Sequence, residues 1–273
     1  MMRTVLTIAG FDPSGGAGVL ADIKTFAAFG CFGAAAITSL TSQNSQGVYA
    51  VYYQTPEILH RQLAPVLEDY EIAAVKIGML PTAELVEVVA AMITRFGLKN
   101  IVFDPVLRSS SGYALIEDEA KNALLETLLP LTDLITPNLD EVEMLLGTKP
   151  ALPTEMSEAA QQLSRQLSAK KNAPVAVLVK GGHLPEAATD VLFDGKDIHV
   201  FSTAKIATRH THGTGCTLSS AIAALLALGF ELPEAVRRAK DYVTAAIQHA
   251  PGIGQGAGPM NHFYSYAPDQ LFN

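Results

Sequence analysis

The stretch from Thr211 to Ser220 places two glycines, several small hydroxyl side chains and a cysteine directly before an apolar run. Gly213 and Gly215 allow positive φ and let a ligand approach the backbone without meeting a Cβ atom. The helix expected to begin here carries unpaired N–H groups and the positive end of its dipole, an arrangement that binds phosphates. Cys216 could take a proton from an attacking hydroxyl, or donate to a developing phosphoryl charge. We expect its place at a helix N-terminus to lower the pKa of its thiol. The alternative interpretation is an ordinary helix start capped by Thr214.

Other chemistry-bearing residues follow short apolar runs that are typical of buried strands. They are Asp12, Gln43, Met79, Asp104, Asn138 and Lys180. Ligands of open α/β sheets bind beyond the carboxyl ends of the strands, so we expect these side chains to lie at one edge with the 211–216 loop. Phosphoryl transfer needs N–H donors, a cation and usually Mg²⁺. Lys180 could reach a phosphate, and Asp104 and Glu141 offer the carboxylates that Mg²⁺ prefers.

Each of these residues also has a purely structural interpretation. Asp104 is followed by proline and could form a turn, and Glu141 could be an acid favoured by a helix dipole. Lys180 could be a solvated strand end. His210 and His212 flank the glycine loop, where either could act as a base, orient the loop or face solvent.

Strand-like and helix-like segments alternate along the chain, which predicts a mostly parallel sheet covered on both faces. We expect strands at 5–9, 34–40, 73–77, 101–103, 134–135 and 175–179, and an edge or flap strand at 48–53. We expect helices at 20–28, 56–67, 84–96, 117–129, 140–146, 154–167, 214–228 and 233–250. Residues 190–206 predict short strands around a hairpin turn at Asp194-Gly195. No composition break divides residues 1–273, so we expect one domain, with no regular structure after residue 252.

The composition of the chain limits the classes of partner that it could bind and the compartment that it suits. A formal net charge of −8 over 273 residues argues against nucleic acid or an anionic membrane surface. The two cysteines, Cys31 and Cys216, provide neither a zinc cluster nor a disulfide framework, which favours a reducing compartment. The apolar run from Ala221 to Leu228 is far shorter than a membrane span, and the N-terminus does not resemble a signal peptide. We therefore expect a soluble, cytoplasmic protein.

Gly16 and Gly18 suggest a rival function, that of an NAD-dependent dehydrogenase, because they match part of a dinucleotide-binding turn between a strand and a helix. That fingerprint needs an acidic residue about 20 positions further on to hold the ribose. No Asp or Glu occurs between Asp22 and Glu57, so the fingerprint is incomplete. Motifs of P-loop kinases, zinc metalloproteases and α/β-hydrolases are absent from the sequence.

Several motifs, taken together and in order from Thr4 to about Ala250, resemble the bacterial hydroxymethylpyrimidine/phosphomethylpyrimidine kinases of thiamine biosynthesis. The motifs are TIAG at 7–10, DPSGGAG at 12–18, ADIKTF at 21–26, TSQN at 41–44, VKIGML at 75–80, DPV at 104–106, ITPNLDE at 135–141, KGGH at 180–183 and THGTGC at 211–216. The resemblance implies a ribokinase-like fold, a three-layer α/β/α sandwich with a mostly parallel central sheet and small edge or flap strands.

The resemblance also implies an activity: ATP-dependent phosphorylation of 4-amino-5-hydroxymethyl-2-methylpyrimidine, and then of its monophosphate. It implies a catalytic anion hole at Gly213, Thr214, Gly215 and Cys216, with the cysteine in place of the usual aspartate base. It implies ATP contacts from Lys180, Asn138 and Thr214, and Mg²⁺ near Asp104 and Glu141. It implies that the pyrimidine meets Gln43, Gly10, Asp22, Met79 and Val106.

Two positions depart from the family pattern. Phe11 stands where the family usually has a small polar residue, and the segment 106–112 lacks a lysine that many members carry before Ser111-Gly112. Arg108 could supply that charge. The alternatives are a pyridoxine or pyridoxal kinase of the same fold, a dual-specificity enzyme, or a binding module without activity. The apolar 48–53 strand predicts a homodimer.

Overall fold

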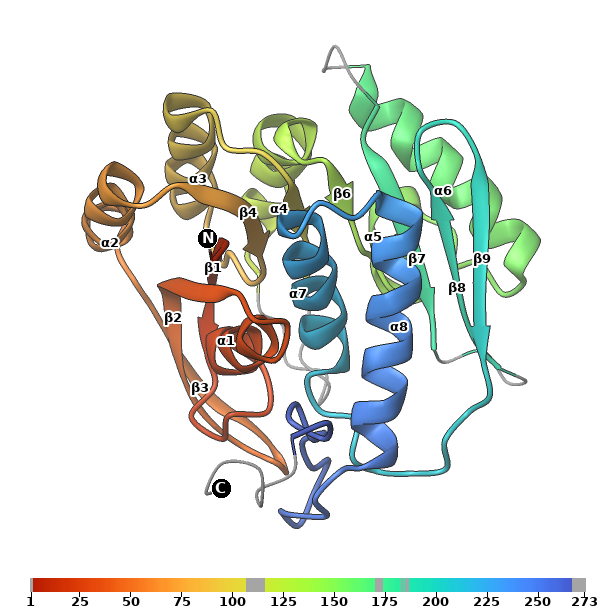
Figure 1. Ribbon diagram of the computed structural model, residues 1–273. Helices are drawn as coiled ribbons and strands as arrows, with labels where there is room; N and C mark the ends of the chain where they lie inside the picture. The colour runs from red at the N-terminus through yellow and green to blue at the C-terminus, as the bar shows by residue number, and fades with distance from the viewer. Residues whose placement is uncertain (1, 107–115, 170–173, 183, 185–186, 267–273) are drawn as a thin grey trace.

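A single twisted sheet organises the computed structural model, which describes residues 2–106, 116–169, 174–182, 184 and 187–266. Within these residues, nine strands pair in the order β3-β2-β1-β4-β5-β6-β7-β8-β9 (Figure 1). The strands are β1 Thr4–Phe11, β2 Phe32–Asn44, β3 Gly47–Tyr53, β4 Ile72–Ile77, β5 Ile101–Phe103, β6 Leu134–Ile135, β7 Ala176–Gly181, β8 Ala188–Phe193 and β9 Ile198–Thr203. The six central strands, β2, β1, β4, β5, β6 and β7 in spatial order, are parallel to one another. At the edges, β3 pairs antiparallel with β2, β8 with β7, and β9 with β8. The mostly parallel sheet with edge strands is confirmed.

Helices cover both faces of this sheet. They are α1 Gly18–Ala28, α2 Pro56–Asp69, α3 Ala83–Phe96, α4 Asp118–Ala123, α5 Leu139–Leu146, α6 Pro153–Ser168, α7 Thr214–Ala227 and α8 Leu232–Gln248. One apolar core lies between the sheet and α1, α7 and α8, and another lies between the sheet and α2, α3, α5 and α6. Figure 1 shows α7 and α8 side by side across one face of the sheet. The three-layer α/β/α sandwich is confirmed.

Both faces of the sheet are buried, which explains why the central strands are continuous apolar runs in the sequence. In β4, Val75 and Ile77 belong to one core while Ala74 belongs to the other. Residues at successive strand positions point to opposite faces, and here both faces are buried. The pairing of these strands sets the positions of the strand ends that carry the polar side chains.

Two elements differ from expectation. The helix expected at 117–129 is divided into α4, a π-helical turn at Leu124–Leu128 and a 3₁₀ turn at Leu129–Leu131. Pro130 has no N–H to donate and restricts the residue before it, which ends regular helix there. The strand expected to end at residue 40 continues as β2 to Asn44, because its last residues pair antiparallel with β3. Gln43 consequently lies on a strand and not in a loop.

The segment after α8 has no helix or strand up to residue 266, as expected, yet it packs against the rest of the molecule. The amide of Asn261 donates to the carbonyl of Ala246, and the Tyr242 hydroxyl donates to the carbonyl of His262 at 2.7 Å. The amide of His212 donates to the carbonyl of Gly258 at 3.2 Å. This C-terminal segment, residues 249–266, therefore contacts both α8 and the glycine loop that precedes α7.

Candidate active site

The anion-binding loop, residues 211–216, turns into α7 through a glycine that no other residue could replace without strain. Gly213 is the N-cap at φ 79°, and a Cβ added to it would lie 1.8 Å from the carbonyl oxygen of Gly16. Thr214 is the first residue of the helix and not its cap, so the capping expectation was wrong, and no described side chain caps α7. The N–H groups of Gly215 and Cys216 have no intrahelical acceptor, and they can donate to an anion.

Lys180 and Asp104 form an ion pair beside this loop, in which Asp104 is buried and Lys180 is partly exposed. The Lys180 Nζ lies 2.6 Å from Asp104 Oδ1, and a Cβ on Gly215 would lie 3.2 Å from the same Nζ. Burial raises the pKa of the Asp104 carboxyl, but the ammonium groups of Lys180 and Lys76 outweigh burial and lower it overall. The structure thus brings an ammonium group and a carboxylate, expected from two strand ends, to the mouth of α7.

Asp104 has further partners that hold it in place. Thr136 Oγ1 donates to Asp104 Oδ1 at 3.1 Å, and Ser219 Oγ lies 3.4 Å from Oδ2.

Burial lowers the pKa of Lys180, but the carboxylates of Asp104 and Glu141 more than offset this and raise it. Lys180 is therefore charged at neutral pH, as a phosphate-binding lysine must be.

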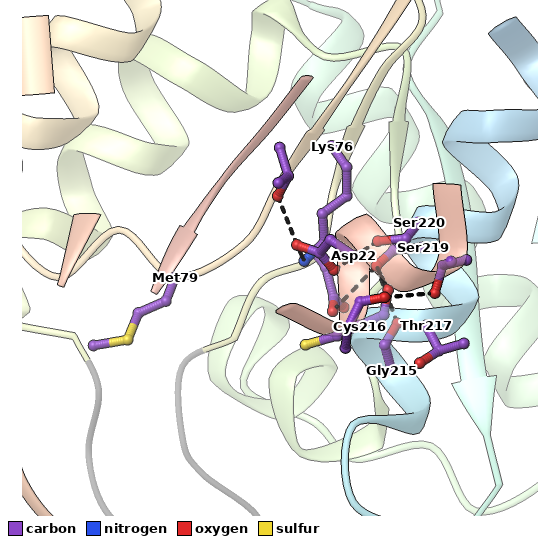
Figure 2. A network of polar contacts seen from close by, with 12 residues as sticks. Asp22, Lys76, Met79, Gly215, Cys216, Thr217, Ser219 and Ser220 are labelled. Atoms are coloured by element: carbon purple, nitrogen blue, oxygen red, sulfur yellow. Dashed lines mark hydrogen bonds and ion pairs between the residues drawn. The ribbon is translucent and has the colours of Figure 1, made fainter. Parts of the chain in front are cut away.

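Cys216 lies at the N-terminal end of α7, with its sulfur on the side that faces Met79 (Figure 2). The helix dipole was expected to lower its pKa. The structure corrects this: burial is the largest influence and raises the pKa of the Cys216 thiol to about 11, whereas the nearby Lys76 ammonium works in the opposite direction. Asp104 and Asp22 raise the pKa further. The thiol is thus protonated at neutral pH.

Asn138 and Glu141 form a capping box at the start of α5. The Asn138 side chain accepts from the Glu141 amide at 2.9 Å, and Glu141 Oε2 accepts from the Asn138 amide at 2.7 Å. The structural interpretation of Glu141 as a helix-first-turn acid is therefore correct, although the carboxylate also lies near Lys180. No group of three His, Cys, Asp or Glu suited to a metal exists among the described residues. Asp104 and Glu141 fit Mg²⁺ only as the one or two carboxylates that accompany nucleotide phosphates and water.

Asp22 occupies a different place from the pocket wall that the resemblance implied. It has no exposed surface, and its Oδ2 lies 3.0 Å from the ammonium of Lys76, which is also fully buried. Thr7 donates to Oδ2 at 2.6 Å, and Ser220 donates to Oδ1 at 2.6 Å. Figure 2 shows Asp22 and Lys76 beside Ser220 and Cys216 on the first turns of α7. Asp22 supports the helix that carries Cys216 and presents no open edge to a ligand.

The other expected pocket residues lie around the ends of β1, β2 and β4. A Cβ on Gly10 would lie 2.9 Å from Ser39 Oγ and 3.3 Å from Met79 Sδ, so Gly10 and Met79 are close neighbours. Gln43 lies near the end of β2, and Val106 lies three residues after β5. Arg108 and the departure at 107–112 lie outside the described residues.

The glycine loop at 12–18 and the anion-binding loop interlock. Asp12 Oδ2 lies 2.8 Å from His212 Nε2, and a Cβ on Gly16 would lie 2.3 Å from the same imidazole ring. The Gly18 amide lies near the thiol of Cys216 and favours its ionised form, a smaller effect than burial. Gly16 in the first loop therefore makes room for the imidazole of His212 in the second.

Comparison with known proteins identifies the family. The model of a family described as phosphomethylpyrimidine kinase matches residues 12–261. The chain belongs to the phosphomethylpyrimidine kinase family. It is a kinase by that membership, which removes the dehydrogenase interpretation of Gly16 and Gly18.

Two curated relatives show how far the likeness to this kinase family extends. A hydroxymethylpyrimidine/phosphomethylpyrimidine kinase of Rhizobium meliloti is 46% identical over 98% of this chain and 100% of its own length. A chloroplastic thiamine biosynthetic bifunctional enzyme of Arabidopsis thaliana is 43% identical over 97% of this chain but only 51% of its own length. The chain thus spans all of one relative and about half of the other.

Solved structures agree on the ribokinase-like fold. A phosphomethylpyrimidine kinase of Clostridium difficile matches with a TM-score of 0.78 and 40% identity, covering 90% of this chain and 99% of that one. A pyridoxal kinase of Bacillus subtilis in complex with ADP matches with a TM-score of 0.84 and 38% identity, covering 96% of this chain and 98% of that one.

Sequence reasoning missed several residues that build this kinase site. Ser219, Ser220 and Thr136 bind the buried carboxylates, but small hydroxyls in apolar segments carry no distinctive signal. His262 lies in the C-terminal segment and its Nε2 is 3.1 Å from Thr217 Oγ1, on the first turns of α7. Lys76, an ionisable residue inside an otherwise apolar strand, is the one such signal that could have been followed.

Proposed function

We propose that this kinase transfers the γ-phosphoryl group of ATP to 4-amino-5-hydroxymethyl-2-methylpyrimidine, and then phosphorylates the resulting monophosphate. The observation that carries the proposal is the uncapped start of α7, with Cys216 in it, beside the Lys180–Asp104 pair. Family membership and the names of the curated relatives support the pyrimidine substrates.

In the proposed reaction, the substrate hydroxyl lies against Cys216 and the γ-phosphoryl group lies over the amides of Gly215 and Cys216. In the first step the hydroxymethyl oxygen forms a bond to phosphorus while the bond from phosphorus to the bridging oxygen of ADP breaks, and the hydroxyl proton passes to an oxygen of the transferred phosphoryl group. In the second step a phosphate oxygen of the monophosphate is the attacking atom, and the same bond to ADP breaks. Lys180 neutralises charge on the phosphates, and the amides stabilise the equatorial oxygens. Bound Mg²⁺, held by Asp104 and Glu141, would supply further charge neutralisation at the phosphates. Asn138 and Thr214 complete the proposed ATP contacts.

We propose that Cys216 first acts as a hydrogen-bond donor to the substrate, because its thiol is protonated. A thiol with a pKa of about 11 holds its proton at neutral pH, so Cys216 begins the reaction as a hydrogen-bond donor. A loose transition state asks little of a base. If Cys216 is needed as a base when substrates are bound, Cys216→Asp retains near-full turnover and Cys216→Ala is slow. A Cys216→Ala enzyme that stays fast removes the base role.

The test of the proposed function is phosphoryl transfer from ATP with Mg²⁺, measured side by side on hydroxymethylpyrimidine, its monophosphate and pyridoxal. We expect turnover on both pyrimidines and slow or no turnover on pyridoxal. Turnover on pyridoxal alone, without a second phosphorylation of the pyrimidine monophosphate, would mean that the kinase chemistry is right and the substrate is wrong. No ATP turnover with any of the three would favour a binding module.

Pyridoxal phosphorylation is the second candidate, because a pyridoxal kinase of Bacillus subtilis shares both the fold and the sequence likeness. A dual-specificity enzyme would phosphorylate pyridoxal and hydroxymethylpyrimidine at comparable rates in the same assay.

We also propose that the enzyme forms a homodimer through β3. This edge strand exposes two large aromatic side chains, Tyr49 at 63% and Tyr52 at 60%. A long edge strand with exposed apolar residues is a ready surface for pairing. A gel-filtration mass at the monomer value would contradict this proposal.

A cytoplasmic location is part of the same proposal. Cys31 and Cys216 are both free thiols, which suits a reducing compartment. In the described part of the chain, no helix has the length and apolar character needed to cross a membrane.

A further inference from the structure

The hydrogen-bond network around His212 settles which way the amide of Gln43 must face. Asp12 is buried, and every partner it has is a donor: the Ser14 amide at 2.9 Å, the Ser14 hydroxyl at 2.7 Å and the Ala17 amide at 2.9 Å. Burial raises the pKa of Asp12, but the hydrogen bonds from His212 and Ser14 lower it overall, so the side chain is an ionised carboxylate. An ionised carboxylate can only accept hydrogen bonds.

The proton position on His212 follows from this carboxylate. His212 Nε2 lies 2.8 Å from Asp12 Oδ2, so Nε2 must carry a proton and donate it. The same nitrogen lies 3.2 Å from the terminal nitrogen of the Gln43 amide. Two donors cannot satisfy each other, but a half-turn of the amide exchanges its oxygen and nitrogen. With the oxygen toward His212, the imidazole N–H is shared between Asp12 and Gln43.

The other end of the amide supports the same orientation. Thr41 Oγ1 lies 3.2 Å from the second terminal atom of Gln43 and donates its own proton to the carbonyl of Phe11 at 3.0 Å. Because that hydroxyl proton is already used, the Thr41 oxygen is free to accept. An amide nitrogen placed there donates to it, and every group in the chain Asp12–His212–Gln43–Thr41 is then satisfied.

We propose that His212, held by Asp12, is a positioning residue that fixes the Gln43 amide and thereby selects the ring edge accepted by the site. The inference deepens the proposed function and rests on it. The fixed amide keeps one lone pair on its oxygen and one hydrogen on its nitrogen for a ligand. The free lone pair can accept from an amino group, and the free N–H can donate to a ring nitrogen beside that group. A 4-aminopyrimidine presents these two groups along one edge. The pyridoxal ring has no amino group beside its nitrogen.

The test compares two variants. His212→Leu fills the space of the imidazole with an apolar side chain and removes the hydrogen-bond donor, whereas the amide nitrogen of His212→Gln can replace Nε2 as a donor. We expect His212→Leu to raise KM for hydroxymethylpyrimidine roughly 3- to 10-fold, the effect of one hydrogen bond. KM for ATP stays within about twofold, and His212→Gln restores the pyrimidine KM. His210→Leu is the matched control in the same loop, because His210 has no contact with Gln43.

Two results would overturn the inference: an unchanged pyrimidine KM in His212→Leu, or equal rises in both KM values that His212→Gln does not reverse. Should His212→Leu fail to fold, Gln43→Glu decides, because a carboxylate still accepts from His212 but cannot donate to the ring nitrogen. That variant should raise the pyrimidine KM, and an unchanged value contradicts the inference.

A measurement without substrate separates this inference from the proposed function. Heteronuclear NMR of nitrogen-labelled wild-type enzyme reports which imidazole nitrogen of His212 carries the proton. Protonated Nε2 supports the network, and a proton on Nδ1 alone overturns it, whichever substrate the enzyme turns over. A wild-type enzyme with protonated Nε2 that phosphorylates only pyridoxal would contradict the proposed function and the edge selection, but leave the positioning of Gln43 intact.

Discussion

The ammonium of Lys76 and the carboxylate of Asp22 lie 3.0 Å apart, and neither side chain has any surface in contact with solvent. Asp22 is also bonded to Ser220, one helical turn after Cys216 on α7. The pair therefore connects β4 and α1 to the helix that carries the proposed catalytic thiol. Gly78 leaves space for the ammonium, because a Cβ there would lie 3.0 Å from Lys76 Nζ.

The first prediction concerns this pair. Lys76→Met leaves Asp22 as an unpaired buried charge, and we expect the free energy of unfolding to fall by about 3–5 kcal/mol. The double variant Lys76→Met with Asp22→Asn removes both charges and should recover most of that loss. Urea unfolding of the three proteins measures it. A single variant as stable as wild type, or a double variant no better than the single, would show that the pair is not the stabilising unit.

The second prediction concerns the reactivity of Cys216. With a pKa of about 11, only about one thiol in a thousand is ionised at pH 8, so alkylation by iodoacetamide is slow. The rate should rise about tenfold per pH unit up to pH 10. Mass spectrometry of the peptide that contains Cys216 follows the reaction, and Cys216→Ser gives the background from Cys31. A rate that reaches its plateau below pH 9 would refute the raised pKa.

The third prediction concerns acid sensitivity at His262. Burial, helped by the charge of Lys24, lowers the pKa of His262 to about 4 in the folded protein, against 6.5 unfolded. The unfolded chain therefore binds a proton that the folded protein refuses, and stability is lost as pH falls from about 6.5 to about 4. The loss attributable to His262 reaches about 3 kcal/mol.

His262→Gln is the comparison for this effect, because glutamine can still accept from Thr217 but does not titrate. The difference in unfolding free energy between the two proteins should change by that amount between pH 7 and pH 4. A difference that is constant with pH would contradict the assignment.

The fourth prediction compares two glycines with positive φ. Gly213→Ala combines left-handed backbone strain with a clash against the Gly16 carbonyl, so we expect a loss of roughly 2–5 kcal/mol and of most phosphoryl transfer. Gly97, at φ 59°, has no atom within 4 Å of an added Cβ. Gly97→Ala should cost only about 1 kcal/mol and leave transfer intact. Equal losses in the two variants would mean that the interlocked loops are not responsible.

Periodicity and strand-end logic predicted the layers, the order of the elements and the approach of Lys180 to Asp104. These follow from local patterns, since the carboxyl ends of parallel strands must share one edge of the sheet. The same logic could not predict that Gln43 would lie on a strand, because the extension of β2 depends on pairing with β3.

The role of Asp22 could not be predicted for a related reason. Its partners Thr7, Lys76 and Ser220 lie up to 198 residues away along the chain, and each of them is unremarkable in its own segment. The pKa of Cys216 was mispredicted because the helix dipole can be inferred from sequence, whereas the depth of burial cannot. Packing at this site outweighed the dipole.

The C-terminal segment has a consequence for how the kinase matures. The backbone of the anion-binding loop pairs with this segment at His212 and Pro259, and its Gly256 amide donates to Ser45 in the turn between β2 and β3. All the helices and strands that the structure describes precede this segment in the chain. Because synthesis proceeds from the N-terminus, the sheet can assemble while the loop still lacks its neighbour. The arrangement of the anion-binding loop thereby depends on a segment that is synthesised after every helix and strand that the structure describes.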